Sequence, residues 1–324
     1  MHIVIPDDYQ DAVRGLACFS KLAGHTVTIH NDTVREIDEL ARRFADAEAL
    51  VLIRERTRIG DDLLARLPRL KLISQTGKGT AHIDLAACTR RGVAVTAGTG
   101  SPYAPAELTW GLVLAATRHI PQEAARLRAG HWQSTLGTGL RGRTLGIWGL
   151  GKIGTLVAGY GRAFGMEILV WGREGSLSRA RAAGYATAES RESLFERSDV
   201  LSLHLKLDRE TRGLVTAADL ARMKPDALLV NTSRAELIET GALEAALRQG
   251  RPGFAAVDVY EQEPILNAAH PLLALDNAVC TPHLGYVEKD SYELYFSQAF
   301  DEVNAFAAGA PVHAVNPEAL QPGR

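Results

Sequence analysis

The feature that most constrains the fold is a glycine-rich turn in the middle of the chain, Gly149-Leu-Gly151-Lys-Ile-Gly154. It follows an apolar run, residues 144–148, and opens a helix-like stretch. In dinucleotide-binding βαβ units the first glycine permits a tight turn, the second lets the backbone approach a pyrophosphate, and the third allows close packing of helix on strand. The turn therefore predicts a dinucleotide site at Gly149, Gly151, Lys152, Ile153 and Gly154. A glycine-rich turn without a ligand is the alternative.

The composition favours two domains and a small-molecule substrate. The chain has 324 residues, 46% of them hydrophobic, which is enough for two cores of ordinary size. The formal net charge is -2 and no basic block occurs, so neither nucleic acid nor a membrane surface is an expected partner. The three cysteines are widely spaced, which predicts reduced thiols and no metal site.

No membrane span or secretory leader is predicted. The N-terminal residues lack a charged segment followed by a long apolar one, and no uninterrupted apolar run reaches about 18 residues. We therefore expect a cytoplasmic protein.

Short aliphatic runs alternate with amphipathic stretches on both sides of a turn cluster at residues 98–102. Before the cluster, the runs are residues 3–5, 27–29, 49–53, 70–73 and 93–95. After it, six runs follow between residues 144 and 280. This alternation predicts two α/β domains, each a doubly wound parallel sheet. Only the second has a glycine-rich turn after its first strand.

Two predicted helices have informative faces. Residues 104–116 are apolar almost all round, so this helix must be buried in a core or against a second subunit. Residues 291–308 carry aromatic side chains at spacings of three and four, which predicts a buried face. The second helix follows the nucleotide sheet and could return to the first domain.

Three polar residues stand where predicted strands of the second half end. They are Arg234 in Asn-Thr-Ser-Arg, Glu263 before Pro264, and His283 in Thr-Pro-His. In an open parallel sheet, ligands bind outside the carboxyl ends of the strands. We therefore expect these three side chains to converge on one crevice.

With these motifs in order, the chain resembles the D-isomer-specific 2-hydroxyacid dehydrogenase family over nearly its whole length. The resemblance implies two Rossmann-like domains, with the nucleotide domain inserted in a discontinuous substrate domain. We expect the substrate domain at residues 1–100 and 288–324 and the dinucleotide domain at residues 101–287. The resemblance also implies a homodimer, with residues 104–116 at its interface.

The reaction of that family assigns a role to each polar residue. Arg234 would bind the substrate carboxylate as a two-pronged donor and polarise the carbonyl beside it. His283 would donate a proton to the carbonyl oxygen, and a neighbouring carboxylate would stabilise its protonated form. Glu263 is the candidate carboxylate. Glu261 lies two residues away, and the following Pro264 decides for Glu263.

The substrate loop is expected at Gly77-Lys78-Gly79, after the fourth strand of the first domain. By resemblance, the backbone amides of this loop hold the substrate carboxylate, so Lys78 and Gly79 are predicted contacts. The chain continues Ala81-His82, where family members usually have Asp-Asn. Lys78 could bind a further anion such as a phosphate, although a solvated loop lysine is the simpler interpretation.

The remaining predicted cofactor contacts lie at the ends of other strands. By resemblance, Asp258 faces the nicotinamide carboxamide, while Thr232 and Ser233 lie along the cofactor.

The end of the second strand of the nucleotide sheet bears on the choice of cofactor. NAD-specific sites place an acidic residue there for the ribose 2′-hydroxyl, but this chain has Gly172 followed by Arg173. An arginine can bind a 2′-phosphate, so NADP(H) is favoured over NAD(H). Glu174 argues against this preference for NADP(H), because its side chain could still reach the ribose.

These observations predict an NAD(P)-dependent oxidoreductase that interconverts a small 2-keto acid and its D-2-hydroxy acid, of the glyoxylate/hydroxypyruvate or 3-phosphoglycerate type. A formate dehydrogenase of the same superfamily is one alternative. In that enzyme a glutamine partners the histidine, so Glu263 argues against it. A nucleotide-sensing, corepressor-like binding protein is another, and no tail or extension in the sequence supports it.

Overall fold

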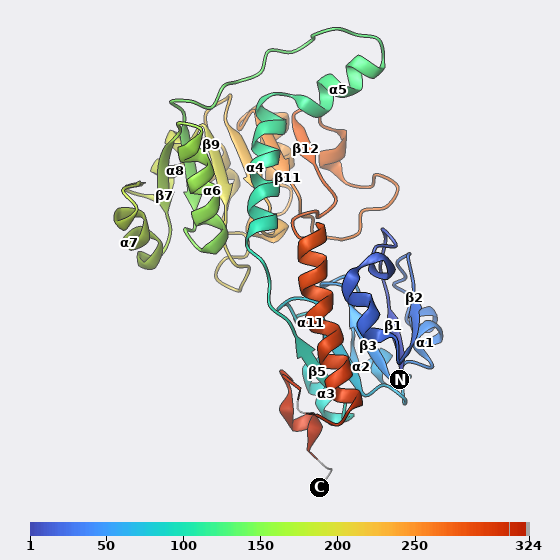
Figure 1. Cartoon of the computed structure of the whole chain (residues 1–324). Coiled ribbons are helices and arrows are strands. Elements are labelled where there is room, and N and C mark those ends of the chain that lie inside the picture. The colour runs from blue at the N-terminus through green and yellow to red at the C-terminus, as the bar shows by residue number, and fades with distance from the viewer. Residues whose placement is uncertain (311, 322–324) are drawn as a thin grey trace. The chain divides into compact units, whose positions relative to one another are not determined.

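The computed structural model describes residues 1–310 and 312–321, and the chain forms two compact units (Figure 1). The terminal unit consists of Met1–Ser101 and Glu288–Arg324, and the inserted unit of Pro102–Val287. Each has one sheet in which all strands are parallel, with helices around it. The predicted fold class, two parallel α/β domains with one inserted in the other, is therefore confirmed.

The terminal unit has a five-stranded sheet whose strands match the aliphatic runs. Across the sheet the strands are β2 (Thr26–Ile29), β1 (His2–Ile5), β3 (Ala49–Leu52), β4 (Leu72–Gln75) and β5 (Ala94–Ala97). The central strand β3 is buried at every position, as an aliphatic run covered on both faces must be.

The helices of the terminal unit come from both ends of the chain. They are η1 (Val13–Gly15), η2 (Ala17–Leu22), α1 (Ile37–Phe44), α2 (Asp61–Leu64), α3 (Leu85–Arg90), α11 (Lys289–Ala307) and η5 (Pro317–Leu320). Helix α11 packs against η2 and the strands β3, β4 and β5, and its face with Tyr295, Phe296 and Phe300 is buried. The last helix therefore does return to the first domain.

The inserted unit has a seven-stranded sheet, one strand more than predicted. Across the sheet the strands are β12 (Ala278–Cys280), β11 (Phe254–Val257), β10 (Leu228–Asn231), β9 (Val200–Leu203), β6 (Thr144–Trp148), β7 (Glu167–Trp171) and β8 (Ala186–Thr187). The six expected runs are present. The additional strand, β8, has two residues at the edge, too few to give an aliphatic pattern.

Helices cover the sheet of the inserted unit. They are α4 (Tyr103–Thr117), α5 (Ile120–Arg128), α6 (Lys152–Ala163), α7 (Glu174–Ala182), α8 (Arg191–Arg197), α9 (Ala217–Leu220), η3 (Ala235–Leu237), α10 (Ala242–Arg248) and η4 (Pro271–Ala274). Buried side chains pack into separate cores, one including Trp110 and Val157 and the other Phe195 and Leu243.

Helix α4 corresponds to the segment that is apolar on every side. It packs against α6, β10 and β11 within the inserted unit, and Trp110 and Val113 on it are buried there. Its apolar character is therefore explained by the core of its own unit. That the same helix also supplies a dimer interface stays a prediction.

Strand order fixes where a ligand can bind in the inserted unit. Strand β6 lies between β7 and β9, so the chain crosses the sheet in one direction after β6 and in the other after β8. At such a switch point the loops at the carboxyl ends of the strands diverge and leave a crevice. The glycine-rich turn follows β6 at this point.

Among the residues that the structure describes, no helix combines the length and the apolar character needed to cross a bilayer.

Candidate active site

The three glycines of the mid-chain turn have the three environments that a dinucleotide turn requires. Gly149 has a φ of +98°, and a Cβ there would stand 2.6 Å from the carbonyl oxygen of His204. A Cβ on Gly154 would overlap the carbonyl oxygen of Gly149. A Cβ on Gly151 would meet nothing within 4 Å. The first and third glycines are thus needed for close packing, and the second leaves open space.

The open space at Gly151 is where a pyrophosphate fits. Gly151 is the residue before α6, and the first amides of that helix, at Lys152 and Ile153, have no carbonyl partner within the helix. These N–H groups and the positive end of the helix dipole attract a phosphate. The residues present therefore fit a dinucleotide. Phosphate contact by this turn was the first prediction from the sequence, and it stays a prediction that the geometry supports.

The end of β7 is tight and strained for any residue with a side chain. Gly172 has a φ of +156°, and a Cβ there would lie 3.1 Å from Cβ of Ser176. Arg173 follows with an exposed guanidinium, which donates to Oε2 of Glu210 at 2.9 Å. The position that is acidic in NAD-specific sites is thus unfavourable for a side chain, and the next side chain is a cation.

Glu174 does not extend toward the end of β7. Its Oε1 accepts hydrogen bonds from Arg181 at 2.8 Å and from Ser178 at 3.0 Å, both on α7. These two donors, Arg181 first, lower the pKa of Glu174. Its carboxylate is therefore engaged along its own helix, which weakens the counter-argument that it reaches the ribose.

Helix α7 is also tied to the glycine-rich turn, which the sequence did not reveal. The amide of Leu150 donates to Oγ of Ser176 at 3.2 Å, and Nε of Arg179 donates to the carbonyl of Leu150 at 2.7 Å. A guanidinium is thereby placed at the turn. No spacing rule identifies Arg179, because its contact depends on how α7 packs.

The histidine and the glutamate predicted as an acid–carboxylate pair are in contact. Nδ1 of His283 lies 2.5 Å from Oε2 of Glu263. The other oxygen of Glu263 accepts from the amide of Tyr260 at 2.9 Å. The ring of Tyr286 stands edge-on to His283, with 5.5 Å between centroids. Both side chains of the pair are partly exposed, 22% for His283 and 32% for Glu263, so the ring can be reached from outside.

The neighbouring glutamate has a different partner. Oε2 of Glu261 lies 3.2 Å from Nε2 of His270. The two glutamates thus pair with different histidines, and only Glu263 pairs with the histidine after β12.

The pairing leaves Nε2 as the atom of His283 that can face a substrate. A carboxylate only accepts hydrogen bonds, so the proton on Nδ1 is directed to Glu263. When the ring is protonated, Nε2–H is a donor; when the ring is neutral, Nε2 is an acceptor. His283 can therefore give a proton in one direction of a reaction and take it back in the other.

Arg234 is placed by the loop after β10. The amide nitrogen of the Asn231 side chain donates to the carbonyl of Arg234 at 2.8 Å, and NH1 of Arg234 donates to the carbonyl of Ser233 at 2.7 Å. Strands β10, β11 and β12 are neighbours, and Arg234, Glu263 and His283 follow their carboxyl ends. The structure thus brings the three to the same edge of the sheet as the glycine-rich turn.

The hydroxyl groups expected along the cofactor have partners inside the unit. Oγ1 of Thr232 lies 2.7 Å from Oγ1 of Thr109 on α4, and Oγ of Ser233 donates to the carbonyl of Leu203 at 2.7 Å. These bonds fix the loop that carries Arg234. Thr109 was missed by sequence reasoning because it lies in an otherwise apolar helix.

Asp258 has more contacts than its expected role implies. It is fully buried after β11, and both carboxylate oxygens accept hydrogen bonds from the loop around His283. Burial raises its pKa, and the hydrogen bonds oppose that rise.

The predicted substrate loop lies in the terminal unit, after β4. Gly77 has a φ of +83°, and a Cβ there would overlap NH1 of Arg54. A Cβ on Gly79 would overlap Oε1 of Glu55. Lys78 between them is exposed. Arg54 and Glu55 were missed by sequence reasoning, although their position just beyond β3 could have identified them.

His82 is an unusual residue beside this loop. Both of its ring nitrogens are buried without a hydrogen-bond partner among the residues that the structure describes. Burial lowers its pKa to about 4, so the ring is neutral at pH 7. No role was assigned to it from the sequence.

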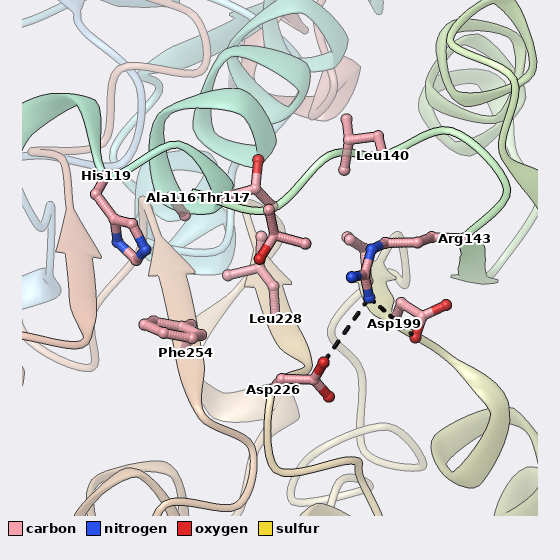
Figure 2. A pocket seen from close by; sticks show the side chains of 11 residues that line it. Ala116, Thr117, His119, Leu140, Arg143, Asp199, Asp226, Leu228 and Phe254 are labelled. Atoms are coloured by element: carbon pink, nitrogen blue, oxygen red, sulfur yellow. Dashed lines mark ion pairs between the residues drawn. The ribbon is translucent and has the colours of Figure 1, made fainter. Parts of the chain in front are cut away.

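A small hollow in the inserted unit is unrelated to these groups (Figure 2). Arg143 pairs there with Asp199 and Asp226, at 3.8 Å each. These residues precede β6, β9 and β10, so the hollow is at the amino ends of the strands. The glycine-rich turn and the histidine pair are at the opposite ends.

Comparison with known proteins decides the family. Residues 110–285 match the model of the D-isomer specific 2-hydroxyacid dehydrogenase NAD-binding domain. The chain belongs to this family. It is therefore an oxidoreductase that acts on CH–OH donors and uses a nicotinamide cofactor, as the resemblance implied.

Individual relatives carry two kinds of description. The chain is 40% identical to a glyoxylate reductase of Aeropyrum pernix over 88% of its own length and 89% of the relative. It is 39% identical to a D-3-phosphoglycerate dehydrogenase of Methanocaldococcus jannaschii over 76% of its length, but spans only 47% of that relative. A phosphoglycerate oxidoreductase structure from Vibrio cholerae O395 is 57% identical, with a TM-score of 0.93 over 96% of this chain and 100% of the other.

Proposed function

We propose that this dehydrogenase interconverts a small 2-keto acid and its D-2-hydroxy acid, with Arg234, Glu263 and His283 as catalytic residues. The observation that carries the proposal is the 2.5 Å contact between His283 and Glu263 at the switch-point edge of the inserted sheet. This pair provides a proton donor on the same edge of the sheet as the dinucleotide turn, and reduction of a carbonyl requires such a donor.

Arg234, His283 and Glu263 have separate roles in the reduction. The nicotinamide cofactor, when bound, supplies the hydride that reaches the carbonyl carbon. Arg234 binds the carboxylate of the keto acid and draws electron density from the adjacent carbonyl. Nε2–H of His283 gives its proton to the carbonyl oxygen, while Glu263 holds Nδ1 and stabilises the imidazolium before transfer. Oxidation of the hydroxy acid reverses each step.

The terminal unit is proposed as the substrate domain and the inserted unit as the dinucleotide domain. The amides of Gly77 to Gly79 are the proposed donors to the substrate carboxylate, and Lys78 adds a positive charge there. The relatives point to a glyoxylate or hydroxypyruvate type and to a 3-phosphoglycerate type. Both classes carry a 2-keto or 2-hydroxy acid, which is the part that Arg234 and the loop would bind.

A matrix of substrates and cofactors tests this function. Initial rates are measured with glyoxylate, hydroxypyruvate, pyruvate and 3-phosphohydroxypyruvate, each with NADH and NADPH, and with formate in the oxidising direction. We expect turnover of at least one keto acid and none of formate. Tight cofactor binding without turnover of any keto acid would instead support a nucleotide-sensing protein and refute the proposed activity.

NADP(H) is proposed as the preferred cofactor. Support comes from the absence of an acidic residue at the tight position of Gly172, from the exposed Arg173 and from the engagement of Glu174 along α7. A surface ion pair such as Arg173–Glu210 contributes little by itself, so a 2′-phosphate can compete for the guanidinium.

The matched variants Arg173→Ala and Arg212→Ala test the cofactor preference. Both remove an exposed arginine that pairs with a glutamate in the inserted unit. Loss of a charged phosphate contact costs about 1.4 kcal/mol or more, so the Arg173 variant should lose about tenfold in affinity for NADPH and little for NADH. Arg212→Ala should bind both as the parent does. Equal loss for both cofactors in Arg173→Ala would contradict the preference.

A homodimer is proposed, with an interface that adds α5 and the segment after it to the expected helix α4. Large apolar side chains are exposed on α5 and on the segment that follows it, among them Leu127, Trp132 at 77% and Leu136 at 95%. Such a patch is typical of an interface between copies. Sedimentation of Trp132→Ser/Leu136→Ser against the parent tests it, because a parent that sediments as a monomer would exclude the dimer.

A further inference from the structure

His283 has a backbone conformation that its side chain disfavours. Its φ is +51°, in the left-handed region, and its amide donates to the carbonyl of Thr281 at 3.0 Å. A residue with a Cβ adopts this conformation only where the surroundings hold it. The histidine of the acid pair therefore depends on contacts made by its neighbours in the chain.

Those contacts converge on one carboxylate, that of Asp258. Oδ1 accepts from the hydroxyl of Thr281 at 2.7 Å and from the amide of Leu284 at 2.7 Å. Oδ2 accepts from the amide of Gly285 at 2.8 Å. One donor precedes His283 and two follow it, so Asp258 binds the loop on both sides of the histidine. We call these three hydrogen bonds the grip of Asp258.

We infer that Asp258 is a positioning residue, whose carboxylate holds His283 in the left-handed conformation that carries its ring to Glu263. This inference rests on the proposed role of His283 as proton donor. It assigns Asp258 an action on the acid pair of the enzyme, in addition to its expected contact with the nicotinamide carboxamide.

The chemistry of the site requires a carboxylate at position 258. Three donors point at the side chain, and a carboxylate has acceptor positions for all of them without a hydrogen of its own. An asparagine would present an NH2 group to at least one of these donors and leave a buried N–H without an acceptor. Asp258 is fully buried, so water does not replace a lost partner.

Gly285 is a second sign that the grip is tight. A Cβ on Gly285 would stand 3.3 Å from Oδ2 of Asp258 and 3.6 Å from Cβ of Pro105. Both neighbours are held in the inserted unit, so an added methyl group presses on the carboxylate. Gly285→Ala thus disturbs the same grip without removing any polar atom.

Steady-state kinetics and cofactor binding, measured separately, test the inference. We expect Asp258→Asn to lower kcat about 10- to 100-fold, because a small displacement of a proton donor is costly. Gly285→Ala should lower kcat in the same direction by less. Because Asp258 is also an expected contact of the nicotinamide carboxamide, the dissociation constant of the reduced cofactor, measured by quenching of tryptophan fluorescence, should rise in Asp258→Asn by less than kcat falls. In Gly285→Ala it should stay within about threefold of the parent. Loss of cofactor affinity in proportion to kcat would overturn the inference.

Two variants of Thr281 give a matched control. Thr281→Val keeps the shape of the side chain and removes one donor to Asp258, so kcat should fall by about tenfold at most. Thr281→Ser restores the hydroxyl and should recover activity relative to Thr281→Val. Equal activity of the two variants would count against the grip.

A double-mutant cycle shows whether Asp258 acts through His283. In a His283→Asn background, Asp258→Asn should cause no further loss of kcat, because the group it positions is already gone. A loss that multiplies with that of His283→Asn would show that Asp258 acts independently.

Hydrogen exchange separates failure of this inference from failure of the proposed function. If the parent reduces no keto acid, the proposed function fails, and the amides of Leu284 and Gly285 still report on the grip. Their exchange should be faster in Asp258→Asn than in the parent, while amides of β6 exchange as before. Unchanged protection at both amides would overturn the inference without reference to catalysis.

Discussion

The two units have similar parallel sheets, but the ends of their first strands differ in chemistry. After β6 the chain turns through Gly149 and leaves open space at Gly151 beside the first amides of α6. After β1 it turns through Asp7 and Asp8, and the carboxylate of Asp8 accepts the amides of Ala12 and Val13 at 3.0 Å each. In the terminal unit a side chain therefore fills the position that a phosphate would take in the inserted unit.

The comparison teaches that topology alone does not make a nucleotide site. A parallel sheet provides strand ends and helix amides in both units. The group that accepts hydrogen bonds from those amides decides the function. Asp8 is fully buried and satisfies them internally. Gly151 leaves them available to an external anion.

The largest expected effect comes from His283→Gln, because the comparison assigns proton transfer to the inserted unit. Removing the proton donor should lower kcat about 10²- to 10⁴-fold with little change in cofactor affinity. Initial rates and fluorescence titration measure the two quantities. His270→Gln is the control, since it removes another histidine that pairs with a glutamate. If the His270 variant lost as much activity, the choice of His283 would be wrong.

Next in size is the effect of closing the glycine-rich turn. Gly149→Ala forces a Cβ into the carbonyl of His204 at a φ of +98°, so cofactor affinity should fall about 10- to 100-fold. Gly159→Ala, on α6 with nothing within 4 Å of the added atom, should bind normally and be slightly more stable. Isothermal titration of both variants checks this. Normal binding by Gly149→Ala would remove the distinction between the two strand ends.

The counterpart in the terminal unit is Asp8→Ala. It leaves one buried and one partly buried amide without their acceptor, which should lower the free energy of unfolding by about 1–3 kcal/mol while cofactor affinity stays unchanged. Thermal unfolding is the measurement. Asp11→Ala, which removes an exposed carboxylate paired with Arg14, should melt near the parent. A weaker affinity for the cofactor in Asp8→Ala would mean that the terminal site is not closed.

The smallest expected effect concerns acid stability. Burial lowers the pKa of His82 in the terminal unit and of His204 in the inserted unit to about 4, against about 6.5 in an unfolded chain. Between these values the unfolded state binds more protons, so the stability present above pH 6.5 is lost as the pH falls toward 4.

The variant His82→Asn isolates the terminal unit's share of this effect. Its loss of stability between pH 7.5 and pH 5 should be smaller than that of the parent by about 2 kcal/mol. The part of this pH-dependent loss of stability that is due to His204 should remain. Melting temperatures at the two pH values measure the difference, and identical pH dependence of variant and parent would assign no such role to His82.

The parts predictable from sequence are those that depend on spacing along the chain. Aliphatic runs located the strands, and the order of motifs placed Arg234, Glu263 and His283 at neighbouring strand ends. The contact between His283 and Glu263 follows from that order, because parallel neighbours bring their carboxyl ends together.

The parts that could not be predicted depend on how side chains turn in the folded unit. Glu174 bonds along α7 because Ser178 and Arg181 lie one and two turns beyond it, and sequence alone left it free to reach the ribose. The expected contact of Asp258 with the cofactor stays a prediction, and no spacing along the chain shows that its carboxylate also accepts hydrogen bonds from the loop around His283. The two-residue strand β8 exists through its pairing with β7 and has no pattern of its own.

The packing of α11 has a consequence for biosynthesis. This helix covers part of the sheet formed by β3, β4 and β5, although about 190 residues separate it from β5. On the ribosome the inserted unit is therefore complete before the terminal unit receives its last helix. The inserted unit can thus fold first, although the terminal unit begins earlier in the chain. Until α11 emerges, the sheet face that carries Ser74, whose hydroxyl donates to the carbonyl of Ala299 on α11 at 3.0 Å, lacks its final cover, and the nascent chain presents this open sheet face to chaperones.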